Sequence, residues 1–214
     1  MKGESVMRKK KLTKMVLLAI LGAWAIVLRM FDFPILPFAP FLKVDLSDLM
    51  VLMGMLIAGP NGLIAVAGVR DGLNYLLKGG EAGIPIGSMM SFIASLCMFL
   101  PTHLILNRSK NFASKHIYLL ITFSLVVSLT LSMAILNYYI TLPIYVNVMD
   151  FPIENFLNYV LTLIFPFNLI KGLILAVGQI LIIKLVSPVM YKKSILNHAY
   201  LSENYSEYQQ LFNH

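Results

Sequence analysis

Long apolar runs, interrupted by short polar segments, dominate the pattern of this chain. Six runs can be drawn, at 12–31, 46–58, 62–77, 84–106, 117–142 and 159–186. A helix needs about 20 apolar residues to cross a bilayer, so the second and third runs are short for a span. The pattern therefore predicts an all-α membrane protein, a bundle of six transmembrane helices.

The segment Gly59-Pro60-Asn61-Gly62 separates the second run from the third. It places a helix breaker between two glycines, which is typical of a turn. Backbone that is not helical at membrane depth needs protein or water around it, so we expect two short helices packed inside the bundle rather than one broken span. Counting both runs as one span gives five, and the two ends of the chain would then lie on opposite sides of the membrane.

Basic residues gather in three clusters at the ends of apolar runs. The clusters precede the first run, join the fourth to the fifth, and follow the sixth (Lys2, Arg8, Lys9, Lys10, Lys11 and Lys14; Arg108, Lys110 and Lys115; Lys184, Lys192 and Lys193). Six spans put all three clusters on one side, which the positive-inside rule makes cytoplasmic, whereas five spans split them. We therefore expect a basic cytoplasmic N-terminus over 1–14, a six-helix membrane domain over 15–187 and a polar cytoplasmic tail over 188–214. From 197 onward we expect a short surface helix or no ordered structure.

Composition agrees with a membrane protein and removes several other classes. Of 214 residues, 58% are hydrophobic and 13% are charged, whereas a soluble domain averages about 25% charged residues. The net charge of +7 does not indicate nucleic-acid binding, because the basic residues form no stripe interleaved with aromatics. The sequence contains no phosphate-binding loop, nucleophile elbow or metal-ligand spacing. We expect no enzymatic activity and no metal or covalent cofactor, with any ATP hydrolysis carried out by another chain.

Polar side chains inside the apolar runs are the candidates for ligand binding. Lys171 lies in the middle of the sixth run, where an ammonium costs about 3 kcal/mol on insertion scales unless it faces a cavity or a partner. Asn168 is three residues earlier and shares its helix face. Asn137, near the end of the fifth run, is a buried amide that needs hydrogen-bond partners. Two amides and a lysine together would suit a polar, planar molecule.

The start of the second run carries a cluster of polar residues. Asp45 or Ser47 can cap the helix, because their side-chain oxygens accept free N–H groups of a first turn. Asp48 would already lie inside the helix. We expect this extra carboxylate near the outer mouth either to receive a polar ligand or to pair with Lys43.

The third run contains Arg70, Asp71 and Asn74. Adjacent residues point about 100° apart on a helix, so Arg70 and Asp71 are expected to be poor partners for each other. Each would then form an interhelical ion pair or contact the ligand, and the sequence favours neither. Asn74 shares a helix face with either of them.

Ala19 and Ala23 lie four residues apart in the first run. Small residues at this spacing lie on one helix face and let another helix approach closely. The spacing alone favours packing within the chain and docking of a partner chain equally.

Taken together, four segments resemble the substrate-binding S components of energy-coupling factor (ECF) vitamin transporters, most closely the riboflavin-binding members. The segments are Lys43 to Asp48, Gly59-Pro60, Leu136 to Tyr139, and Pro166 to Gly172. The resemblance extends from about 13 to 186 and includes the expected six spans and cytoplasmic termini. It implies a helical bundle in the bacterial plasma membrane that captures a vitamin from outside the cell. It also implies partners, namely a shared ECF transmembrane subunit and two ECF ATPase subunits.

The resemblance assigns roles to individual residues. Ala19 and Ala23 match the A-x-x-x-A of the first helix, which in this family docks on the shared transmembrane subunit. Asn137, Asn168 and Lys171 correspond to flavin-contacting positions. With Asp48, Arg70 and Asn74 as further candidates, they form the expected vitamin site, near the outer side among the second to sixth runs, with the loop at 33–42 as a lid.

The chain departs from riboflavin-binding members in two places. Where they carry polar residues in the third and fourth runs, this chain has Ala67 to Leu73 and Gly87 to Phe92. It also gains Arg70, whose guanidinium suits a carboxylate bidentately, and this makes pantothenate the second candidate ligand. From other classes, a membrane enzyme would need a reactive group that is not visible, and an assembly protein would leave Lys171 unexplained. An ion-coupled carrier would be expected to have repeated halves.

Overall fold

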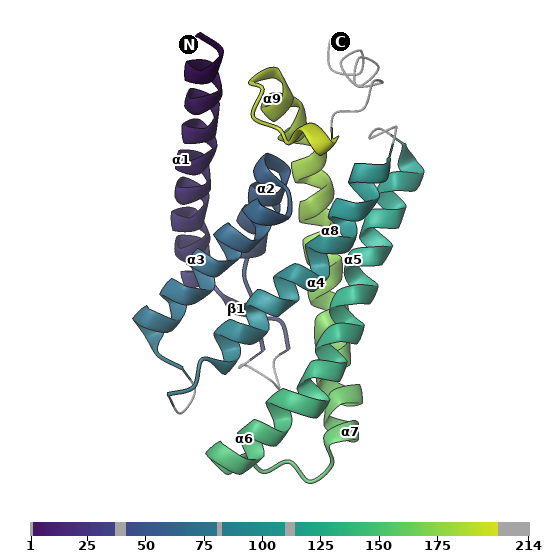
Figure 1. The fold of residues 1–214 in the computed structure, drawn as a ribbon. Helices are drawn as coiled ribbons and strands as arrows, with labels where there is room; N and C mark the ends of the chain where they lie inside the picture. The colour runs from purple at the N-terminus through teal and green to yellow at the C-terminus, as the bar shows by residue number, and fades with distance from the viewer. Residues whose placement is uncertain (1, 37–41, 81–82, 110–113, 201–214) are drawn as a thin grey trace.

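The computed structural model describes residues 2–36, 42–80, 83–109 and 114–200, and this part of the chain is mostly helical (Figure 1). The long elements follow the six apolar runs. They are α1 (Lys2–Met30), α2 (Ser47–Ala58), α3 (Pro60–Lys78), α4 (Ile86–Arg108), α5 (Lys115–Leu136) and α8 (Phe165–Leu185). Phe33–Pro34 (β1) and Lys43–Val44 (β2) form a short antiparallel pair between α1 and α2, with Phe33 opposite Val44. The expected lid falls mainly on 37–41, outside the described residues.

Two of the long helices continue through π-helical turns. α5 passes through η1 (Asn137–Thr141) into α6 (Leu142–Met149), while α7 (Phe156–Tyr159) passes through η2 (Val160–Ile164) into α8. Each π turn is followed by a helix that has a proline in its first turn, Pro143 or Pro166. Proline lacks the N–H that would continue the hydrogen-bond ladder, and single π turns recur at functional sites.

Four helical stretches are long and apolar enough to cross a membrane: Lys10–Met30, Ile86–Arg108, Lys115–Met149 and Phe156–Lys192. Ser47–Ala58 is apolar but short, at 12 residues. The described structure is therefore a multi-helix membrane protein, and the count of six spans stays a prediction.

The turn between α2 and α3 forms where the sequence placed it. Gly59 adopts φ +64°, and Pro60 occupies the first turn of α3. The two helices then pack at van der Waals distance through Gly54 and Gly62. A Cβ at Gly62 would lie 2.0 Å from the carbonyl oxygen of Gly54, so only glycine allows this approach.

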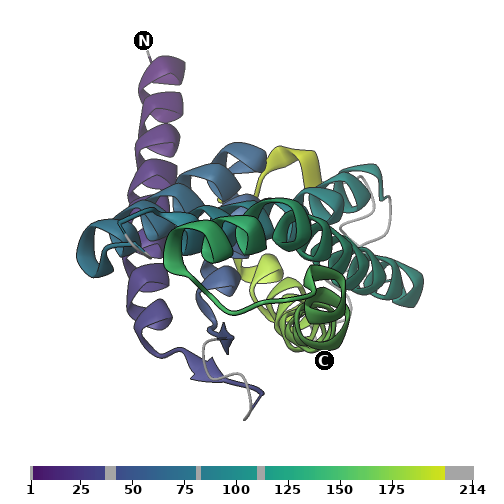
Figure 2. The ribbon, with the colours of Figure 1, turned by 90° about the horizontal axis from the view of Figure 1, so that it is seen from below.

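The helices form two groups joined by a buried core. α1 packs on α2 and α3, and α5 packs on α4 and α8, as the views in Figures 1 and 2 show. Gly172 lets α8 approach the backbone of Val126 on α5, and Gly22 of α1 lies against Val69 of α3. The side chains between the groups are apolar and fully buried (Leu52, Met55, Met98, Phe99, Leu125 and Leu129).

The end of the described chain packs into the bundle rather than lying on its surface. After α9 (Ser187–Lys192), the Asn197 N–H donates to the Leu56 carbonyl at 2.8 Å. In η3 (His198–Tyr200), Tyr200 is 1% exposed and its hydroxyl lies 2.6 Å from Nδ1 of His103. Burial raises the pKa of the Tyr200 hydroxyl, which therefore stays protonated. The expected surface tail is thus wrong for Tyr200, which packs against the end of α2; residues 201–214 lie outside the described part.

Candidate binding site

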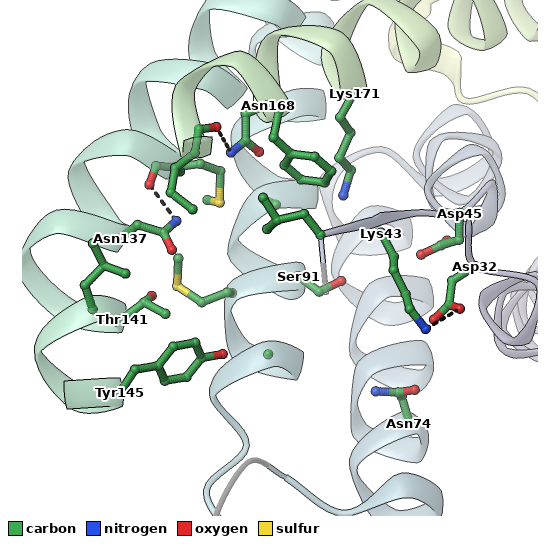
Figure 3. A pocket seen from close by; sticks show the side chains of 18 of the residues that line it. Asp32, Lys43, Asp45, Asn74, Ser91, Asn137, Thr141, Tyr145, Asn168 and Lys171 are labelled. Atoms are coloured by element: carbon green, nitrogen blue, oxygen red, sulfur yellow. Dashed lines mark hydrogen bonds and ion pairs between the residues drawn. The ribbon is translucent and has the colours of Figure 1, made fainter. Parts of the chain in front are cut away.

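A cavity of about 550 Å³ lies among α1, α3, α4, α5 and α8, at the end of the molecule where α6 and α7 are found. Its volume is within the range of about 300–1,000 Å³ that holds a small organic ligand. Figure 3 shows its polar side chains in two groups, one on α8 and η1 and the other around β2 and α3. Four of the predicted site residues line it: Asn74, Asn137, Asn168 and Lys171. Arg29 of α1 also contributes, so the first run belongs to the site as well.

The two asparagines use their amide groups in the same way. Nδ2 of Asn137 donates to the carbonyl of Met133 at 2.7 Å, and Nδ2 of Asn168 donates to that of Ile164 at 2.8 Å. One of the two N–H groups of each amide is thus engaged by the preceding turn of its own helix (Figure 3). The amide oxygens are left as hydrogen-bond acceptors at the cavity wall. This wall can accept two hydrogen bonds from a ligand.

Lys171 supplies a donor beside these acceptors. Its side chain is 14% exposed, and Nζ lies 3.6 Å from Oδ2 of Asp48. The ammonium has three N–H donors, and a contact of 3.6 Å is an ion pair rather than a good hydrogen bond. A charged donor therefore faces the cavity without being fully engaged by the protein.

Thr141 is a site residue that sequence reasoning missed. Its side chain lines the cavity and the residue is only 4% exposed, yet its hydroxyl has no hydrogen-bond partner in the described structure. It is the last residue of η1, four residues after Asn137, and Figure 3 shows both on the same wall. A buried hydroxyl without a partner costs about 1–3 kcal/mol, so a ligand hydrogen bond there would recover part of that cost.

Aromatic and sulfur-containing side chains complete this wall. They come from α5, α6, the loop after α6, α7 and α8 (Met133, Tyr145, Met149, Phe151, Tyr159 and Phe167). Aromatic faces favour offset or edge contacts with other ring systems, and methionine adapts to irregular shapes. The wall therefore suits a flat, largely apolar ring that carries a few polar atoms at its edge.

Arg70 does not line the cavity. Its side chain is 0% exposed, and all three guanidinium nitrogens are engaged. Nη1 donates to Asp48 at 2.7 Å, while Nη2 donates to Asp71 and to Ser95, each at 2.8 Å. Ser95 in turn donates to Asp48 at 2.8 Å. Arg70 and Asp48 are therefore joined in an interhelical ion pair beneath the cavity, one of the two alternatives that the sequence left open.

Two expectations about these charges are wrong. Arg70 and Asp71 do pair, with a second hydrogen bond from Nε at 3.2 Å, because the long arginine side chain folds back to its neighbour. Asp48 does not pair with Lys43, which lies 3.0 Å from Asp32 at the exposed mouth. The capping expectation is only partly met: Asp45 accepts the N–H of Ser47, the first residue of α2, at 2.7 Å, but the N-cap position is occupied by Leu46.

The predicted docking residues Ala19 and Ala23 lie outside the cavity, on α1. Ala19 and Ala23 are both exposed, whereas Gly22 between them is buried against Val69. The alanines therefore do not serve the packing of α1 within the described chain. Exposed apolar side chains continue this face, including Met15 four residues before Ala19 and Val27 four residues after Ala23.

A family model described as "ECF transporter, substrate-specific component" matches residues 13–183. The chain belongs to this family. It is 32% identical over 170 residues to the riboflavin transporter FmnP of Bacillus subtilis, covering 78% of this chain and 88% of that protein. It is 36% identical over 182 residues to the riboflavin transporter RibU of Streptococcus thermophilus, covering 84% of this chain and 85% of that protein.

A solved structure points to the same family. The S component of a bacterial ECF transporter superposes on this substrate-specific component with a TM-score of 0.69 at 28% identity, covering 84% of this chain and 98% of that one. The resemblance seen in the sequence is thus confirmed at the level of the family and of the fold. The matched residues include Lys171, Asn168 and Asn137, and the whole of the cavity wall formed by α5 to α8.

Proposed function

We propose that this substrate-specific component binds riboflavin from outside the cell and presents it to an ECF importer. The arrangement of Asn137, Asn168 and Lys171 carries this proposal. Two amide oxygens accept and one ammonium donates at a wall that is otherwise aromatic and apolar. The isoalloxazine ring of a flavin is flat and largely apolar. Its polar edge carries one N–H, which can donate to an amide oxygen, between two carbonyl oxygens, which can accept from Lys171 or from the second N–H of an asparagine amide. The similarity to riboflavin transporters of several bacteria points in the same direction.

Pantothenate remains the second candidate, with less support than the sequence indicated. Its case rested on Arg70 as a partner for a carboxylate. The guanidinium of Arg70 is fully buried and donates hydrogen bonds to Asp48, Asp71 and Ser95 instead. A carboxylate in the cavity would have Lys171 and Arg29 as cationic contacts instead.

The assembly we propose is that of an ECF importer in the bacterial plasma membrane. Six spans, over 15–187, would place the basic N-terminus and the polar tail on the cytoplasmic side. The start of α1 and helix α9 lie at the same end of the molecule, opposite the cavity, which supports this arrangement (Figure 1). The partners would be a shared transmembrane subunit, docked on Ala19 and Ala23, and two ATPase subunits that hydrolyse ATP.

The first experiment is to identify the small molecule that co-purifies with the chain in detergent. Visible absorbance and mass spectrometry of the released material should show riboflavin. A colourless protein that binds labelled pantothenate would move the proposal to the second ligand. A protein that binds neither would overturn the vitamin assignment.

The docking part of the proposal needs a separate test. Ala19→Trp should stop vitamin uptake by cells that carry the whole importer, while riboflavin binding by the isolated chain should stay unchanged. Leu119→Trp is the matched control, because Leu119 is exposed on α5, away from α1. Uptake that survives Ala19→Trp would contradict the docking face.

A further inference from the structure

Arg29 is the one charged residue of α1 that reaches the cavity wall in the described structure. It lies in the last turn of the helix, and its side chain is 16% exposed. Nη1 donates to Oδ1 of Asp71 at 2.7 Å and to Oγ of Ser91 at 2.5 Å. Ser91 also accepts from Arg70 at 3.0 Å. The guanidinium is thus held at the edge of the Arg70 cluster, on a mostly buried side chain that lines the cavity.

The guanidinium of Arg29 retains hydrogen-bonding capacity. It carries five N–H donors, and in the described part of the chain only Nη1 has protein acceptors. Nε and Nη2 donate to no described side chain or carbonyl. Arg70, by contrast, uses all three of its nitrogens. Of the two arginines, Arg29 is therefore the one that can bind a ligand.

The surroundings of Arg29 differ from the aromatic wall. Ser91, Asn74 and the ion pair of Lys43 with Asp32 lie on this side of the cavity, across from Asn137 and Tyr145 (Figure 3). This side therefore combines hydrogen-bond donors and acceptors: the ammonium donates, the carboxylate accepts, and the hydroxyl and amide groups do both. Such a surface suits a flexible chain of hydroxyl groups, which can donate and accept at each carbon.

We propose that Arg29 is a ligand-binding residue that receives the polyhydroxyl chain of the vitamin, with Asp71 as the residue that positions it. This inference rests on the proposed flavin function and divides the ligand between two regions. The ring lies against Asn137, Asn168 and Lys171, and the ribityl chain lies against Arg29 and Ser91. The first helix, which carries Ala19 and Ala23 on its outer face, thereby contacts the ligand with its last turn.

The test compares riboflavin with lumiflavin, which has the same ring but a methyl group in place of the ribityl chain. Dissociation constants are measured by flavin fluorescence for the wild type, Arg29→Gln and Arg29→Lys in detergent. Loss of a hydrogen bond from a charged donor weakens binding about 10- to 100-fold. We expect Arg29→Gln to lose riboflavin affinity by this factor and Arg29→Lys to lose less, while lumiflavin affinity changes less than about 3-fold for both.

Arg108→Gln is the matched control, because Arg108 also lies in the last turn of a helix but is exposed and outside the cavity. Thermal unfolding checks that each variant is folded. If Arg29→Gln does not fold, Arg29→Lys keeps a cation for Asp71 and decides the question by the same comparison of the two flavins.

Two results would overturn the inference. Unchanged riboflavin affinity in Arg29→Gln would remove Arg29 from the site. An equal loss for riboflavin and lumiflavin would show that Arg29 acts on the ring or on the fold, not on the polyhydroxyl chain. A wild-type chain that binds neither flavin would overturn the proposed function together with this inference.

Discussion

Two groups of polar residues, one buried beside the cavity and one on its wall, use their hydrogen-bonding capacity in opposite ways. On α2, α3 and α4, Arg70 and Asp48 are buried together, and their hydrogen-bonding capacity is used within the protein. On η1 and α8, the oxygens of Asn137 and Asn168 and the hydroxyl of Thr141 have capacity left over. The first region stabilises the bundle and the second is available to a ligand. Charge inside a membrane protein therefore marks a binding site only where its partners do not already satisfy it.

Breaking the buried cluster should have the largest effect. Arg70→Met leaves Asp48 and Asp71 without their main partner, and loss of one member of a buried ion pair costs about 3–5 kcal/mol. We expect a large fall in the thermal unfolding midpoint in detergent. Lys43→Met, which breaks the exposed pair with Asp32, should cost about 0–1 kcal/mol. Equal shifts in the two variants would contradict the structural role of the cluster.

Lys171→Met should separate binding from folding. Asp48 keeps Arg70 and Ser95 as partners, so the fold should survive. Removal of the charged donor should weaken riboflavin binding about 100-fold or more, as expected for truncating one partner of a buried charged contact. Equilibrium titration with riboflavin measures this loss. A variant that binds like the wild type would refute the assignment of Lys171 as a ligand contact.

Substitution of Asn168 should weaken riboflavin binding less than substitution of Lys171. Asn168→Ala removes one acceptor and should weaken riboflavin binding about 10-fold, the value of a well-formed hydrogen bond. Asn158→Ala is the matched control, because Asn158 is exposed on α7 and does not line the cavity. Comparable losses in both variants, measured by the same titration, would argue against a specific role for Asn168.

The smallest effect is expected at Thr141, and it has a close control. Thr141→Val should weaken riboflavin binding about 3- to 10-fold through loss of one neutral hydrogen bond. Thr130 is also buried with an unpartnered hydroxyl but does not line the cavity. Thr130→Val should leave the riboflavin dissociation constant unchanged. If both threonines behave alike, the hydroxyl of Thr141 does not contact the ligand.

Most of the fold was predictable from hydrophobic periodicity. The six runs correspond to six helices, of which α2 is short, and Gly59-Pro60 marks the turn between α2 and α3. The boundaries near 142 and 159 were not predictable, because π turns carry α5 on to Met149 and start α8 from Phe156. Tyr200 was assigned to a polar tail because its neighbours are polar, and only the packed structure reveals its partner His103.

The site was predictable where spacing alone placed a residue on a cavity face. Asn168 and Lys171 share a face at three residues apart, and Asn137 and Asn74 also line the cavity. Arg70 could not be separated from these by sequence, because its partners come from α2 and α4. Arg29 was missed because a basic residue at the end of an apolar run looks like an ordinary interfacial residue. The sequence around Thr141 gave no signal that a π turn would place its hydroxyl on the cavity wall.

The charge cluster also has a consequence for the order in which the protein is made. Arg29, Asp48, Arg70 and Asp71 are all translated within the first third of the chain, and their two positive and two negative charges balance. The buried cluster of these four residues is therefore electrically neutral before the rest of the protein exists. Lys171 is translated about a hundred residues later, and its ion-pair partner Asp48 has by then already been made. The surplus positive charge that faces the cavity is thus the last one added.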